Sequence, residues 1–244
     1  MRKIISGFAI IFIFSISAFS QTAEEIVEKY INAVGGLNKW TAINSQKVSG
    51  KLSMGGMEFP FISYSKRPNL NYTEVTIQGM MVKQAFDGNT GWLINPMTGS
   101  SKAEKMDDDM AKTIINRGTI GGQLLNYKEL SCTIELIGKE TSEGLELFNI
   151  KLTNKEGDAG NYYIDAVSYL LIRNNSKVKR MGSEVSSETL YGDYKSSGDV
   201  ITYYSIETKI QGMDMGSQKI VIEKIEQNID IDDNIFKMPV DHNK

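Results

Sequence analysis

The sequence predicts a mainly β fold of the α+β class, a single strongly curved antiparallel half-barrel of about 10–12 strands with an N-terminal helix and a central helical insertion. Three observations support this prediction. Apolar residues alternate with polar ones in short segments after residue 45, and glycine, proline and asparagine turns separate these segments. The apolar period becomes helical only near residues 22–43 and within residues 106–127.

The N-terminal residues 1–20 have the anatomy of a secretory signal peptide, because Arg2 and Lys3 precede an apolar run that ends in small residues. This run is shorter than the roughly 20 residues of a membrane-spanning helix, so we expect cleavage rather than an uncleaved anchor. The single cysteine, Cys132, is far from the cleavage point, and no lipid anchor is expected. Residues 21–244 should therefore form one domain, located in the periplasm or secreted.

Two helical segments are expected at the start of the mature chain. Thr22 and Glu25 have the spacing of a capping box, and the apolar residues after them repeat at helical spacing up to Val34. A glycine pair ends this helix, and a short amphipathic segment with Trp40 follows.

The predicted strands are short segments of alternating polarity bounded by turn residues. They cover residues 48–54, 58–66, 70–77, 80–86, 91–94, 132–139, 145–153, 161–164, 169–173, 184–194, 200–210 and 218–226. Their short connections favour a meander of antiparallel neighbours. A sheet of this length curls, so its inner side must be filled by side chains, by the helices or by a ligand.

The central insertion, residues 106–127, is predicted to contain two short helices. Three consecutive acidic residues that begin at Asp107 precede Met110 and Ile114, which follow at helical spacing, and Leu124 follows a second glycine pair. Consecutive residues of a helix point in different directions, so capping of the positive helix end explains the acids better than a metal site does.

Composition and residue usage exclude several classes of function. The formal net charge is −3 and no basic block occurs, so nucleic acid is not an expected partner. The single histidine, His242, lies near the C-terminus, which leaves no Ser-His-Asp or Cys-His arrangement on an ordered scaffold. No phosphate-binding glycine loop is present. We therefore expect a non-enzymatic monomer without metal or cofactor.

Methionine is used unusually often, with twelve residues in the chain. Met54, Met57, Met80 and Met213 each lie in or beside a glycine turn. Flexible, polarisable side chains suit the rim of a site for apolar ligands of irregular shape. The same positions also fit ordinary core packing or exposed hairpin tips.

Several short motifs resemble a known family of exported proteins. Residues 66–70 and 87–96, with the ending 236–239, resemble the LolA/LolB-like superfamily of periplasmic lipoprotein carriers, which includes the lipid carrier LppX and the envelope-stress regulator RseB. Residues 84–88 and 169–172 resemble the group called outer-membrane lipoprotein-sorting proteins. These motifs indicate the fold more specifically than the cargo.

The resemblance implies an apolar cavity for acyl chains that is enclosed by the half-barrel and covered by a helical lid at about residues 106–127. Arg67 matches the family arginine that holds the lid to the barrel, and it would bond to carbonyl groups of that insertion; a plain surface arginine is the alternative. Candidate cavity residues are Met54, Met57, Phe61, Met80, Phe86, Trp92, Met110, Ile114, Leu124 and Met213. Trp92 also fits a packed core position.

The function expected from this resemblance is a periplasmic carrier or binder of lipidated proteins or free lipids, with a place in outer-membrane lipoprotein sorting. Its partners would be acyl chains, together with envelope membrane proteins as donor and acceptor. The alternative is a protein-interaction module similar to RseB, in which the groove or a sheet edge binds a polypeptide.

Overall fold

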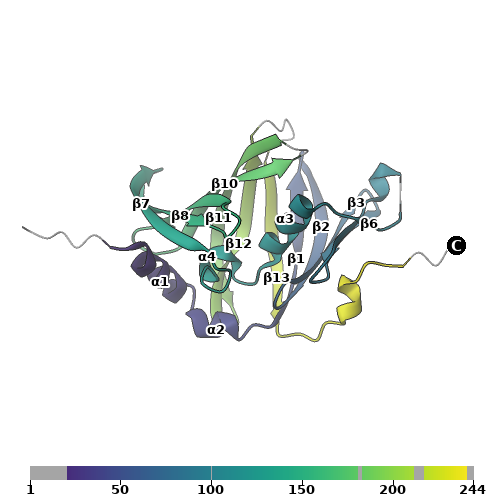
Figure 1. The fold of residues 1–244 in the computed structure, drawn as a ribbon, viewed down its shortest axis with the longest axis horizontal. Helices are drawn as coiled ribbons and strands as arrows, with labels where there is room; N and C mark the ends of the chain where they lie inside the picture. Colours follow the sequence, from purple (N-terminus) through teal and green to yellow (C-terminus); the bar gives the residue numbers. More distant parts are fainter. Residues whose placement is uncertain (1–20, 100, 181–182, 212–216, 241–244) are drawn as a thin grey trace, which may run out of the picture.

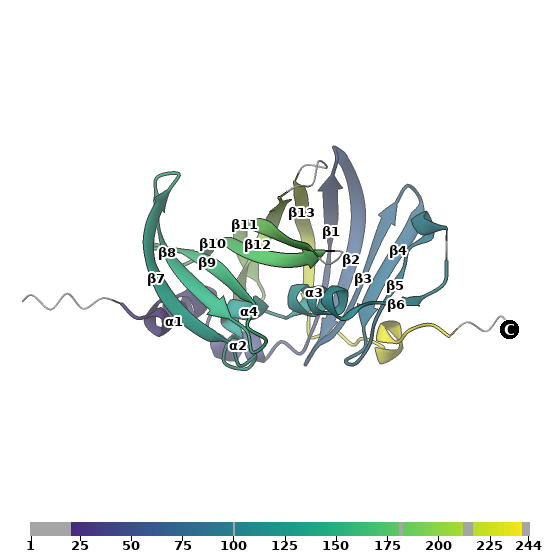
Figure 2. The same cartoon turned by 45° about the horizontal axis from the view of Figure 1, so that its top comes forward.

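The computed structural model describes residues 21–99, 101–180, 183–211 and 217–240, so the expected signal peptide lies outside the described residues. Thirteen described strands form one antiparallel sheet with two free edges, and short helices lie against it (Figure 1). Turning the molecule shows how strongly the sheet curves (Figure 2). The predicted half-barrel is confirmed.

The described elements follow one another in chain order. They are α1 (Ala23–Ala33), α2 (Leu37–Thr41), β1 (Ser45–Met54), β2 (Met57–Lys66), β3 (Leu70–Ile77), β4 (Met80–Phe86), β5 (Gly91–Ile94), the 3₁₀ helix η1 (Pro96–Thr98), β6 (Glu104–Lys105), α3 (Asp108–Gly118), α4 (Gly122–Leu125), β7 (Thr133–Ser142), β8 (Leu145–Thr153), β9 (Ala159–Asp165), β10 (Leu171–Arg180), β11 (Ser183–Ser197), β12 (Val200–Ile210), β13 (Gln218–Gln227) and the 3₁₀ helix η2 (Asp233–Phe236). None of the described helices has the length and apolarity that crossing a membrane requires.

The sheet consists of two meanders joined at β1 and β13. In space the strands run from β6 to β1, then β13, and then back to β7 at the other edge. Val48 lies opposite Ile225 where the two meanders meet. The first and last strands of the chain thus form the centre of the sheet.

Three of the differences from the strand prediction have a clear physical reason. The structure has thirteen described strands, whereas twelve were predicted. The additional strand is β6, whose two residues are too few to show alternation. The segment predicted to start at Tyr169 starts at Leu171, since Tyr169 has a positive φ of 56° and belongs to a turn. Strands β10 and β11 are longer than predicted, because the polar residues around their connection carry no alternating signal.

The larger core lies where α1, α2 and α4 pack on strands β8–β12. Ile26, Val27 and Tyr30 of α1 are buried there against a cluster that includes Ile150 and Ile164. The predicted capping box is present, since the Thr22 hydroxyl accepts from the Glu25 amide and the Glu25 carboxylate accepts from the Thr22 amide. This half of the inner side is filled by the protein itself.

A second, smaller core holds α3 against β3–β5. Phe86, Met106 and Ile114 are its fully buried members. Gly118 at the end of α3 lies against Asn71 so closely that a Cβ there would be 1.5 Å from the Asn71 Oδ1. The predicted acidic cap is also present, because Asp107 accepts a hydrogen bond from the Met110 amide.

Candidate functional site

An apolar row crosses five neighbouring strands on the face that the helices cover, which we call the inner face. The row consists of one residue from each strand, and each residue lies directly opposite the next. In the order of the strands in the sheet, its members are Tyr191 on β11, Ile206 on β12, Ile220 on β13, Leu52 on β1 and Phe59 on β2. Phe59 is buried, whereas the other four side chains are half-buried. Directly opposed side chains on one face touch, so the row is continuous.

A second row lies beside the first and contains a glycine in its middle. Ile222 lies opposite Gly50, which lies opposite Phe61, and Val75 and Val82 continue the row on β3 and β4. A Cβ at Gly50 would be 2.1 Å from the Val221 carbonyl oxygen and 3.1 Å from the Phe61 ring, so the close backbone approach on one side and the ring on the other require a glycine here. The row therefore presents the Phe61 ring over bare backbone.

Together the two rows form what we call the inner apolar surface. Its members are Leu52, Phe59, Phe61, Val75, Val82, Tyr191, Ile206, Ile220 and Ile222. One end adjoins the core of α1, with which Tyr191 packs, and the other adjoins the core of α3 at Phe86. An apolar area that stays half-exposed between two helical covers can accept a further apolar group.

Five of the predicted cavity residues share the inner face. The strand register puts the side chains of Met54, Met57, Phe61, Met80 and Phe86 on the same side of the sheet. Met57 and Met80 are exposed at hairpin tips, while Phe86 is buried under α3. Only Phe61 belongs to the inner apolar surface itself.

The predicted candidates on the insertion do not form one group. Ile114 is buried against Phe86, whereas Met110 is exposed on the same helix. Leu124 is buried in the larger core, in the same cluster as the buried residues of α1. Met213 lies outside the described residues.

Trp92 is on the opposite, outer face of the sheet, which corrects its assignment to the cavity. Phe86 lies opposite Gly91, so Trp92 lies opposite Ala85 and points away from α3. Its indole Nε1 donates to the Phe236 carbonyl at 2.7 Å, and its side chain is 2% exposed. The alternative position, a packed core aromatic, is the one observed.

Sequence reasoning missed Tyr191, Ile206 and Ile220. Each of them lies in a strand that the alternation of apolar and polar residues predicted. This alternation shows that each residue shares a face with every second residue of its own strand. The pattern does not show that β13 pairs with β1, and this long-range pairing is what joins these residues to Leu52.

Five tyrosines from α1, β9, β11 and β12 gather at the end of the inner apolar surface that adjoins the core of α1, and one of them, Tyr191, belongs to that surface. They are Tyr30, Tyr162, Tyr191, Tyr194 and Tyr203. The Tyr191 and Tyr203 ring centres are 4.7 Å apart, and the Tyr194 hydroxyl donates to the Leu171 carbonyl at 2.6 Å. Burial raises the pKa of all five hydroxyls above the ordinary tyrosine value, so this tyrosine cluster is neutral at physiological pH.

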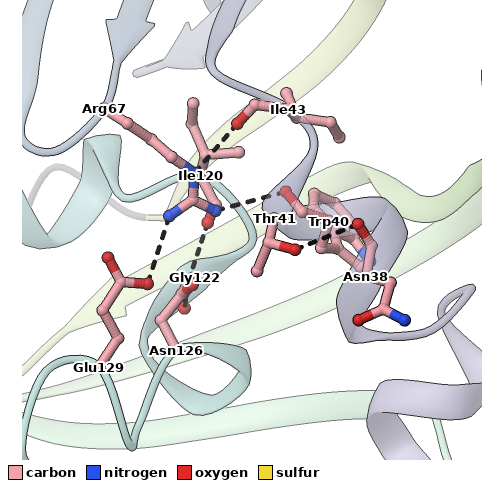
Figure 3. Close-up of polar contacts among 9 residues, drawn as sticks. All are labelled: Asn38, Trp40, Thr41, Ile43, Arg67, Ile120, Gly122, Asn126 and Glu129. Carbon is pink, nitrogen blue, oxygen red and sulfur yellow. Dashed lines mark hydrogen bonds and ion pairs between the residues drawn. The ribbon is translucent and has the colours of Figure 1, made fainter.

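Arg67 joins three segments of the chain through its polar contacts (Figure 3). Its Nε donates to the Ile43 carbonyl at 3.0 Å and its Nη2 to the Trp40 carbonyl at 3.4 Å, while Nη1 is 3.4 Å from the Glu129 carboxylate. Both carbonyls that Arg67 bonds thus belong to α2 or to the residues directly after it. The prediction that Arg67 bonds to carbonyls within residues 106–127 differs from this. Arg67 still faces the insertion, because it lines a cleft of about 20 Å³ with Gly118, among others.

Arg67→Leu should destabilise the protein by about 2 kcal/mol, because the two carbonyls lose a charged donor at a mostly buried side chain. Urea unfolding measures this loss. Hydrogen exchange should rise in residues 37–43 and in residues 118–130. Lys66→Leu is the matched control, since it removes only the exposed ion pair with Asp233. Equal effects of the two substitutions would show that Arg67 does not hold these segments together.

Comparison with known proteins identifies the fold. No protein-family model and no curated protein sequence matches the chain. Among solved structures, a LolA superfamily protein from Nitrosomonas europaea has a TM-score of 0.60 at 13% identity, over 89% of this chain and 98% of that one. A DUF1329 family protein from Desulfovibrio piger has a TM-score of 0.59 at 12% identity, with the same two coverages.

A third structure, a domain described as an outer membrane lipoprotein-sorting protein from Vibrio parahaemolyticus, has a TM-score of 0.57 at 10% identity, over 87% of this chain and 94% of that one. At these identities the similarity concerns the fold. The LolA-like half-barrel that the sequence motifs suggested is confirmed at that level.

Proposed function

We propose that this protein is an exported, non-enzymatic binder of acyl chains that carries lipids or lipid-modified proteins through the periplasm. The inner apolar surface carries the proposal, because it leaves half-buried apolar side chains on seven neighbouring strands between two helical covers. Each methylene removed from water contributes about 0.8 kcal/mol, so a dozen methylenes contribute roughly 10 kcal/mol. An acyl chain therefore needs such a surface to cross an aqueous compartment.

The helix α3 is the proposed lid. Among the described residues it is held by a core with three buried members, Phe86, Met106 and Ile114, whereas the core around α1 is far larger. Separating a small apolar contact costs less than separating a large one, so α3 can leave the sheet while the rest stays folded. Arg67 contacts α2 and Glu129, and it would couple the segment after this lid to the barrel.

The location and partners of the carrier are part of the same proposal. Residues 1–20 would direct export and be removed, and the mature monomer would receive cargo from one envelope membrane protein and deliver it to another. Native mass spectrometry of the mature protein, purified gently from its own periplasm, would identify the cargo. A bound acylated species at fixed stoichiometry supports lipoprotein or lipid transport, and a mass without any addition contradicts it.

Phe61→Asp should weaken binding of a fluorescent fatty acid by more than about tenfold. The substitution puts a charge in the middle of the inner apolar surface, and desolvating an unpaired carboxylate under an acyl chain opposes binding. Fluorescence titration of the mature protein measures the affinity, after circular dichroism has shown that the variant is folded.

Ile62→Asp is the control for this experiment. Ile62 is the next residue of β2 and points to the outer face, so Ile62→Asp replaces an apolar side chain by the same charge without altering the inner apolar surface. Its affinity should stay within about twofold of the parent. If both variants lost the same affinity for the fatty acid, or if neither lost any, the inner apolar surface would not be the acyl-binding site.

A protein-binding function remains the second candidate, and the free edge of β7 favours it. Among the described residues β7 pairs with β8 alone, so the other side of its ten residues offers backbone groups to an added strand. Ile137 is exposed on this strand. Peptide binding that survives Phe61→Asp but is lost when β7 carries a proline would favour this candidate.

A further inference from the structure

A groove of about 540 Å³ lies on the outer face, on the other side of the sheet from the inner apolar surface. Tyr64 and Tyr72 lie opposite each other on β2 and β3, and Tyr72 and Trp92 both lie opposite Ala85 of β4. The ring centres are 6.1 Å apart for the two tyrosines and 6.2 Å apart for Tyr72 and Trp92. Three aromatic rings thus form one side of what we call the outer groove.

The other side of the outer groove is the C-terminal segment, residues 230–239, which follows the sheet and includes η2. Ile231 and Phe236 are buried, and the Phe236 carbonyl accepts the Trp92 indole hydrogen bond. Lys66 forms an ion pair with Asp233 at 2.6 Å. These contacts fix the segment at several points along its length, so the groove is formed before any ligand binds.

The lining combines aromatic rings with polar groups of both signs. Its charged and amide side chains are Glu74, Lys83, Asp230, Asp232, Asn234 and Lys237. Glu74 and Lys83 lie directly opposite each other, and the Tyr72 hydroxyl donates to the Glu74 carboxylate at 2.7 Å. The lining therefore offers both hydrogen-bond donors and acceptors beside its aromatic rings.

We propose that the outer groove binds a neutral oligosaccharide. A pyranose ring has apolar C–H faces that suit the rings of Tyr64 and Tyr72, and hydroxyl edges that both donate to carboxylates and accept from ammonium groups. An acyl chain would leave the charged groups of the lining unused and desolvated, which opposes its binding. A polyanion would meet three carboxylates at the same place, which also opposes it.

The experiment titrates the mature protein with maltotetraose and with chitotetraose and follows the backbone amide signals by NMR. Saturable shifts should concentrate in residues 64–94 and 230–239. Tyr72→Ala and Tyr64→Ala should each weaken binding about tenfold or more, because each removes one ring that a sugar would contact. Tyr204→Ala is the control, since Tyr204 is a half-buried tyrosine that does not line the groove and has Lys195 above its ring.

Each outcome decides the proposal. It is overturned if neither sugar shows saturable binding up to about 10 mM, or if the two groove variants bind as well as Tyr204→Ala does. Displacement of signals by an unstructured peptide, but by neither sugar, would make the groove a peptide site instead. Fatty-acid binding should be unchanged in Tyr72→Ala, so this proposal and the acyl-binding proposal can fail independently.

Discussion

Above about pH 10 we expect the folded protein to lose stability by several kcal/mol per pH unit and to unfold cooperatively by about pH 12. The cause is the tyrosine cluster of Tyr30, Tyr162, Tyr191, Tyr194 and Tyr203. Burial raises the pKa of each hydroxyl in the folded state, because a phenolate there would be poorly solvated.

The sign of the effect follows from where the protons are lost. In the unfolded chain the tyrosines titrate near their ordinary pKa of about 10, whereas in the folded state they stay protonated well above it. The stability that they contribute is therefore complete below about pH 10 and is lost as the pH rises. Each tyrosine of the cluster that stays protonated in the folded state lowers the stability by up to about 1.4 kcal/mol per pH unit above its ordinary pKa. Over about one to two pH units the sum is comparable with a typical total stability of about 5–15 kcal/mol.

The measurement follows two signals during an alkaline titration, the ultraviolet absorbance of phenolate and the far-ultraviolet circular dichroism. The buried tyrosines should ionise only when the sheet unfolds, so the two transitions should coincide for that part of the absorbance change. Tyr203→Phe should move the unfolding midpoint to higher pH, since it removes one ionisable group and keeps the ring that contacts Tyr191.

Tyr169→Phe is the matched control in the opposite direction. Hydrogen bonds from Gln21 and Lys29 lower the pKa of Tyr169, so removing its hydroxyl should not raise the alkaline midpoint. If the full phenolate signal appeared before the loss of circular dichroism, the tyrosine cluster would be accessible to hydroxide and its proposed role in alkaline unfolding would be wrong.

Local pattern was sufficient to predict most of the elements but not the surface that they form. Alternation identified β12 and β13, and it thereby fixed which residues of each strand share a face with Ile206 or Ile220. Which of the two faces is covered by helices depends on how the strands pair in space. The contact of Leu52 with Ile220 joins strands that are far apart in the chain, and no local signal specifies it.

Trp92 shows a case in which the sequence contained more information than was used. Phe86 and Trp92 were both expected inside, yet the turn at residues 87–90 puts Phe86 opposite Gly91 and shifts Trp92 to the other face. Counting the hairpin register would have separated them. For Met57 and Met80 the hairpin-tip alternative describes their exposed positions, because each is the first residue of its strand, next to a hairpin turn, and has few neighbours there.

Trp92→Ala should destabilise the protein by about 3–5 kcal/mol, a cost typical of deleting a fully buried aromatic side chain. The indole is buried between β5 and the C-terminal segment, and Phe236, whose carbonyl it bonds, is 1% exposed. We expect the segment at residues 229–240 to detach while the rest of the sheet persists. Urea unfolding measures the loss, and limited proteolysis shows where the chain opens.

Trp92→Phe separates the two contributions of this side chain. It keeps an aromatic ring in the same space but leaves the Phe236 carbonyl without its donor, so it should cost about 1–2 kcal/mol. A loss below about 1 kcal/mol for Trp92→Ala would mean that the segment is held by its other contacts, such as Lys66 with Asp233. Trp92 and Phe236 are 144 residues apart, so their contact ties the end of the chain to the sheet. The free energies of unfolding of the two variants together measure how firmly this contact holds the C-terminal segment that forms one side of the outer groove.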